Sequence, residues 1–174
     1  MKKRFARLLF AIVTIGASIL IGKALIRRFR GYRESILIAG GGVSAQVDFY
    51  TSLTGFTSGS NQMMQTRRFH TETRLFEVGR ILFTGGMEAG VVLNSAELYN
   101  PYLNTFNATA ASMKQGRVFH TATLLPGGWV LIAGGESGSH PPIIHNTAEF
   151  YDPYSDSFSG LISMAHPFAT IQQL

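Results

Sequence analysis

Histidines are the side chains of this sequence best suited to bind a metal ion or to transfer a proton. His70 and His120 lie fifty residues apart, at matching places in two similar segments. Equivalent residues of a repeat need not converge on one centre, so we expect each to be hydrogen-bonded within its own strand or turn. His140 and His145 share the segment 136–146, but two histidines alone are a weak metal signal. The histidines therefore predict no metal site, and His140 and His145 remain weak candidates for ligand binding.

Arginine and glutamate also recur at matching positions. Arg67 or Arg68 is followed by Glu97, and Arg117 is followed by Glu149. A catalytic acid and base normally occur once, whereas this combination occurs twice, so we interpret both as structural ion pairs. No nucleophile–histidine–carboxylate or paired-carboxylate arrangement stands apart from the repeat. The sequence therefore predicts no catalytic residue and a protein that is not an enzyme.

Cysteine and glycine narrow the chemistry further. The chain has no cysteine, which excludes disulfides, thiolate metal sites and cysteine nucleophiles. Three apolar segments end in paired glycines: Gly40, Gly41, Gly85, Gly86, Gly134 and Gly135. A phosphate-binding loop would place a helix start and a lysine beside such a pair, and both are missing here. We therefore expect these glycines to allow positive φ and close backbone approach, and we predict no cofactor.

The elements that hold these residues come from an internal repeat. The segments 67–106 and 116–158 superimpose, and a more degenerate copy covers 36–59. Tyrosine recurs at one position of all three copies: Tyr50, Tyr99 and Tyr151. A residue that returns in every copy more often builds the scaffold than binds a ligand, so these rings are expected to pack between sheets.

Each copy contains four short apolar stretches bounded by Gly, Pro, Asn or Asp, which predicts four strands. In the second full copy these are 120–125, 130–133, 148–151 and 157–162. The stretch 130–133 is apolar throughout, as expected for a strand buried on both faces. With no helical periodicity after Gly31, the predicted class is all-β.

The motifs HTATLL, VLIAGG, SAELYNP and TF resemble the kelch repeat, in the form found in the galactose-oxidase-like central domain. The resemblance covers about residues 35–164 and implies β-propeller blades of four strands each. The repeats would occupy 34–174, with blades at about 36–75, 80–125 and 129–174, the last incomplete. Oxidation chemistry of the galactose oxidase kind requires a cysteine-crosslinked tyrosine, which this sequence cannot form.

About three blades are fewer than a closed propeller requires. Three explanations stay open: a fragment of a larger propeller, self-association with a second copy, or an open arc that shields its ends. After Met164 the sequence leaves the register of the preceding copies, because His166 does not match His70 or His120. We expect a fragment of a larger propeller.

The basic head, 1–33, precedes the repeats. Nine of the 15 Lys and Arg residues lie before the first acidic residue, Glu34. The stretch 5–26 is long enough to span a membrane as a helix, which predicts an uncleaved anchor. A cleaved signal peptide and an organelle presequence are the alternatives. The protein is therefore expected to be membrane-anchored or secreted, outside the cytoplasm.

The remainder of the chain is mildly acidic, so no nucleic-acid partner is predicted. The segment 136–146 is three residues longer than its counterpart 87–94. Loops that vary between repeats are where such folds place specificity. The predicted function is a non-enzymatic module that binds a protein or a glycan, and the alternative is the remnant of an extracytoplasmic carbohydrate-active or oxidase-like enzyme.

Overall fold

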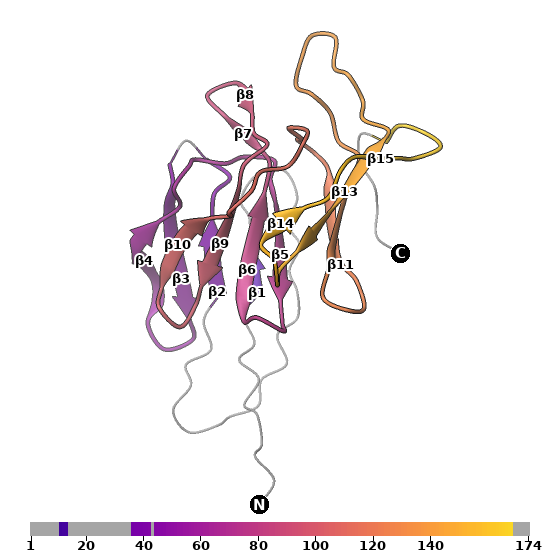
Figure 1. The fold of residues 1–174 in the computed structure, drawn as a ribbon. Coiled ribbons are helices and arrows are strands. Elements are labelled where there is room, and N and C mark those ends of the chain that lie inside the picture. Colours follow the sequence, from indigo (N-terminus) through magenta and orange to yellow (C-terminus); the bar gives the residue numbers. More distant parts are fainter. Residues whose placement is uncertain (1–10, 14–35, 43, 169–174) are drawn as a thin grey trace, which may run out of the picture.

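The computed structural model describes residues 11–13, 36–42 and 44–168, which form strands and turns and contain no helix (Figure 1). The all-β prediction is confirmed. Within these residues no helix is long and apolar enough to cross a membrane. The predicted membrane segment 5–26 and the basic head 1–33 lie outside the described residues, apart from Ala11–Val13, which form strand β1.

The described residues form three sheets and one small hairpin. The first sheet contains β1, β2 (Ile36–Ala39), β3 (Gln46–Thr51) and β4 (Gly55–Gln62). The second contains β5 (Thr71–Leu75), β6 (Arg80–Thr84), β9 (Ala96–Asn100) and β10 (Thr105–Ala108). The third contains β11 (Thr121–Leu124), β12 (Val130–Ala133), β13 (Thr147–Asp152), β14 (Ser157–Phe158) and β15 (Ile162–Ser163). The hairpin is β7 (Met87–Glu88) with β8 (Val91–Val92).

Neighbouring strands are antiparallel in all three sheets except β1 and β2, which pair in parallel. The sheets stand side by side along the chain, the second between the first and the third (Figure 1). The observed sheets are each shifted by one strand from the predicted blades, which were 36–75, 80–125 and 129–174. The last strand of each of the first two predicted blades belongs to the following sheet: 71–75 pairs with β6, and 121–124 pairs with β12. The strand expected over 157–162 is divided into β14 and β15, which both pair with β13.

Two apolar cores lie between the sheets. Ile81 and Phe83 of β6 pack with β2 and β3 of the first sheet. Leu82, on the opposite face of β6, packs with Val130 and Ile132 of β12. The second sheet is thus buried on both faces, which explains its continuous apolar run. In β12 the prediction holds only in part, because Leu131 is only half-buried on the face turned away from the second sheet.

Paired glycines join the sheets where the chain passes from one to the next. We call the segments 63–70, 113–120 and 164–168 the crossing segments. The amide of Gly86 donates to the Arg117 carbonyl at 2.8 Å, and Gly41 makes the same bond to Arg67. Gly85 and Gly86 have φ of +60° and +93°, as expected for glycine at such an approach.

The last crossing segment repeats this geometry. Gly135 donates to the Phe168 carbonyl at 2.8 Å, so Phe168 takes the backbone position of Arg67 and Arg117. Met164 donates to Asn146, as Met113 donates to Asn94. The backbone through Phe168 therefore keeps the register that the sequence loses after Met164.

Candidate functional site

The recurring arginines lie in buried polar clusters between sheets. Nε of Arg67 donates to Oε1 of Glu97 at 2.8 Å, and both side chains are buried. Nη1 of Arg67 donates to the carbonyls of Gly85 and Ser95 at 2.9 and 3.0 Å. Arg68 is exposed and is not the partner of Glu97. The predicted structural ion pair is confirmed, with Arg67 as its cation.

The third sheet contains the same cluster. Nη2 of Arg117 lies 3.4 Å from Oε1 of Glu149, and Nη1 donates to Gly134 and Thr147 at 2.8 and 2.9 Å. Burial lowers the pKa of the Arg117 guanidinium, and Glu149 opposes that shift. Because both carboxylates are buried beside a guanidinium, they are poorly placed to exchange protons with a ligand.

Each glutamate also holds a crossing segment. Glu97 accepts backbone amide hydrogen bonds from Met64 at 2.6 Å and from Gln65 at 3.1 Å. Glu149 accepts the equivalent bonds from Lys114 and Gln115. With the arginine, each carboxylate thus accepts from three donors. The clusters therefore position the sheets.

His120 connects two sheets, contrary to the expectation of a bond within its own strand or turn. Its Nε2 lies 2.9 Å from Oγ1 of Thr71 and 3.2 Å from Oγ1 of Thr84, both in the second sheet. The two nitrogens of His70 make no hydrogen bond within the described residues. His70 instead packs on Gly40, where a Cβ would lie 2.5 Å from its Cε1. Both rings therefore pack at the contacts between sheets.

Acid should weaken the His120 contact. Burial, with the Arg117 charge, lowers the pKa of His120 to about 3, against 6.5 in the unfolded chain. The stabilisation is complete above pH 6.5 and is lost as the pH falls toward 3, because the unfolded chain then binds the proton more tightly. We expect unfolding at pH 5 to take up about one proton more in the wild type than in His120→Gln.

The measurement is the urea stability of both proteins between pH 7.5 and 5. Comparing the two proteins at each pH cancels the contributions that other titrating groups make to stability. One such group is Glu72, because burial raises its pKa to about 7. Parallel stability curves for the wild type and the variant would contradict the prediction.

The burial of the recurring tyrosines depends on which sheet carries each of them. Tyr99 packs between the first and second sheets, and Tyr151 between the second and third. Their hydroxyls donate to Asn104 and Asp156 at 3.0 and 2.8 Å. Tyr50 lies on the outer face of the first sheet and is exposed. Two of the three rings thus pack between sheets as expected.

The structure separates the two histidines of the segment 136–146. His145 is buried, and its Nδ1 lies 2.9 Å from the Gln115 amide nitrogen. Its Nε2 donates to the Gly116 carbonyl at 3.1 Å, and burial lowers its pKa. His140 is exposed. His145 therefore belongs to the crossing between sheets, and only His140 remains available to a ligand.

The segment 136–146 and the β7–β8 hairpin project from the same edge of the stack (Figure 1). A Cβ on Gly138 would lie 2.5 Å from Cγ2 of Val92 and 3.1 Å from Cε of Met87, so the two loops touch. Val91 and Ile143 remain about two-thirds exposed, at 65% and 64%. We call the β7–β8 hairpin and 136–146 together the loop surface. The sequence predicted the second part and missed the first, although the Glu88-Ala89-Gly90 turn signals a hairpin.

A charged hollow lies beside the hairpin, along 87–90, with a volume of about 200 Å³. Arg68 and Glu88 line it beside Met87. Glu88 accepts from Oγ1 of Thr66 at 2.6 Å, and this bond holds its pKa below the usual value. The loop surface thus combines apolar tips with the fixed carboxylate of Glu88, and the exposed guanidinium of Arg68 lies beside it.

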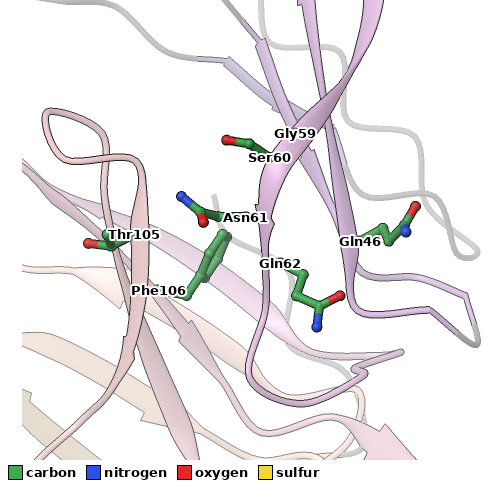
Figure 2. Close-up of a pocket in the computed structure, with 7 residues that line it drawn as sticks. All are labelled: Gln46, Gly59, Ser60, Asn61, Gln62, Thr105 and Phe106. Atoms are coloured by element: carbon green, nitrogen blue, oxygen red, sulfur yellow. The ribbon is translucent and has the colours of Figure 1, made fainter.

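A second hollow, of about 380 Å³, opens between β4 and β10 (Figure 2). The described residues that line it carry no charged side chain: Gln46, Gly59, Ser60, Asn61, Gln62, Thr105 and Phe106. Between the second and third sheets, Thr109 and Ala111 take the places of Gly59 and Asn61. There the Thr109 hydroxyl donates to the Ala96 carbonyl, and Ala111 packs on the core. Amides, hydroxyls and an aromatic ring can bind a neutral polar ligand but cannot supply acid–base chemistry. Sequence inspection missed this site, whose only signal is the polar run in an outer strand.

A pair of phenylalanines was also missed. Phe69 and Phe119 have φ of +59° and +57°, unusual for bulky residues, and their rings lie 4.5 Å apart. The recurring Phe-His dipeptide was their only signal in the sequence.

Across the part of the chain that the structure describes, no three His, Asp or Glu side chains gather to hold a metal ion. Neither protein-family models nor curated proteins match this chain.

Proposed function

We propose that this protein is a non-enzymatic binding module built from kelch-type β-propeller blades, and that its loop surface binds a partner protein. One observation carries the proposal: two neighbouring repeats present different loops that pack together and expose Val91 and Ile143. Apolar tips beside charged groups are the composition of a protein-binding patch.

The kelch-type assignment rests on the repeated motifs and is supported by the antiparallel four-stranded second sheet. The enzyme-remnant alternative is less well supported. The recurring arginine, glutamate and buried histidine side chains are engaged between sheets, and the chain has no cysteine for a tyrosine crosslink. Positions that repeat serve the scaffold, and positions that differ between repeats are left for recognition.

We propose that the basic head either directs export of the module or anchors it in a membrane through 5–26, and anchoring would require Ala11–Val13 to leave their pairing with β2. The blades would then face an extracytoplasmic partner. The mildly acidic composition after Glu34 argues against nucleic acid as that partner.

Site-specific photocrosslinking of the full chain in its native host tests the proposal. A benzophenone amino acid placed at Ile143 is expected to give a discrete crosslinked protein band. The control places it at Phe76, which is equally exposed at 63% but lies in the turn between β5 and β6. Equal labelling at both positions, or none at Ile143, would reject a protein partner at the loop surface.

A glycan array probed with the same full chain in detergent separates the other partner class. Glycan binding that survives Ile143→Asp but is lost in Asn61→Ala would assign recognition to the hollow of Figure 2. That result, without a crosslinked protein, would replace the loop surface as the binding site.

A further inference from the structure

The interfaces between sheets repeat residue by residue. Phe49 of β3 faces Tyr99 of β9, with ring centroids 6.4 Å apart. One sheet later, Leu98 of β9 shares a core with Tyr151 of β13. Each contact pairs a residue of one sheet with the following tyrosine position of the next.

This series identifies the residues that would form another such interface. Phe150 of β13 corresponds to Phe49 and Leu98, because each directly precedes the recurring tyrosine. The tyrosine position on the free face of the first sheet is Tyr50. The two outer faces of the stack are therefore complementary to each other.

The outer face of the third sheet carries an apolar cluster. Trp129 is 46% exposed, and its ring lies 5.8 Å from that of Phe150. Leu131, paired with Phe150 across the strands, points to the same side. These residues occupy the positions that Arg80, Leu82 and Leu98 hold in the second sheet.

The outer face of the first sheet has the matching features. Tyr50 and Phe56 pair at 5.0 Å, as Tyr99 and Phe106 do at 4.7 Å in the buried interface. Phe56 is 70% exposed, although its counterpart Phe106 packs in the core. An apolar ring pair built for an interface thus remains on the surface.

The polar parts of the interface are present as well. Asp48 is exposed at the position where Glu97 binds the amides of Met64 and Gln65. The crossing segment 164–168 presents the equivalent amides at Ala165 and His166. An acceptor on the outer face of the first sheet thus matches donors beside the outer face of the third.

We propose that these two faces bind a second copy of the chain, the third sheet of each copy packing on the first sheet of the other. Two such contacts related by a twofold axis close a ring of six sheets, within the four to eight blades that propellers contain. The partner is a second copy because the aromatic pair, the apolar cluster, the acceptor and the backbone donors of the inner interfaces recur on these two faces, with Phe168 in the place of the buried arginine. This inference goes beyond the proposed binding function and does not depend on the loop-surface partner.

Chemical crosslinking tests the contact, since the natural chain contains no cysteine. Facing sheets lie about 10 Å apart, beyond the reach of a disulfide, so a short bis-maleimide is the suitable reagent. Full-length Tyr50→Cys and Phe150→Cys, carrying different tags, are co-expressed and treated in membranes or mild detergent. The expected result is a mixed dimer that forms with this pair and not when Phe76→Cys replaces Tyr50→Cys.

Other outcomes overturn the proposal. No mixed dimer means that something else covers these faces, such as a different protein or further blades of a longer chain. Crosslinking of either single variant to itself means a symmetric contact through one face. A ladder of higher oligomers from a chain carrying both substitutions means an open filament and not a closed ring.

A second measurement does not depend on cysteine chemistry. Phe56→Asp is expected to convert the dimer to a monomer by light scattering, after subtraction of detergent mass, with unchanged circular dichroism. Phe76→Asp, at a similarly exposed phenylalanine, should leave the dimer intact. A monomeric wild-type protein would refute the contact.

Discussion

Replacing Arg117 with methionine is expected to lower the free energy of unfolding by about 3–5 kcal/mol, because it leaves a buried carboxylate without its cation. Arg117 and Glu149 are both fully buried. The substitution also removes the donors to the Gly134 and Thr147 carbonyls. Unmet buried acceptors add to the cost of the uncompensated charge.

Urea denaturation of the full chain in detergent measures this loss. The single tryptophan, Trp129, directly precedes β12 of the third sheet, so its fluorescence reports the unfolding of that sheet. The control is Lys114→Met, which removes an exposed cation from the same crossing segment. The double variant Arg117→Met/Glu149→Leu should be more stable than Arg117→Met alone, because the lone charge is removed. If Arg117→Met is no less stable than Lys114→Met, the cluster is not a structural requirement.

Replacing Gly85 with alanine is expected to destabilise the protein by about 2–5 kcal/mol, through positive φ and overpacking together. The added Cβ would lie 2.6 Å from the Arg117 carbonyl oxygen and 2.8 Å from Cε1 of His120. A backbone carbonyl cannot move aside cheaply, because the Gly86 amide binds it. The second and third sheets would therefore be forced apart.

Gly55→Ala separates the two causes. Gly55 has a φ of +69°, close to the +60° of Gly85, but nothing lies within 4 Å of its Cβ position. Gly55→Ala should therefore lower the free energy of unfolding only by the cost of the positive φ, about 1–2 kcal/mol. Urea denaturation of both variants compares them directly, and equal losses would show that close approach at Gly85 contributes nothing.

Local patterns in the sequence were sufficient for the strands and for the ion pairs. Four short apolar stretches per repeat mark the strands, because alternation and turn residues act over a few neighbours. Arg117 and Glu149 were paired correctly because the same combination returned at Arg67 and Glu97. A repeat reveals structural residues, since each copy solves the same packing problem.

Contacts between the repeats of the chain could be found only from the tertiary structure. The segment 71–75 follows the first repeat in sequence but pairs with β6, because strand pairing depends on hydrogen bonds and not on where a motif is divided. His120 binds threonines 49 and 36 residues away, which no local pattern encodes. His145 looked like a loop residue and is buried, because the chain after the long loop returns to the crossing segment.

The candidate sites show the same division. Unequal loop lengths in the sequence marked 136–146, but only the fold places it against the β7–β8 hairpin and so defines the loop surface. The uncharged hollow arises because Gly59 and Asn61 stand where the next interface has Thr109 and Ala111, a difference visible once the sheets are superimposed. Sequence alone determined the repeated scaffold of this protein, because each copy carries it within a short span. The surfaces left for binding depended on which repeats lie against each other, and that is a property of the packed chain.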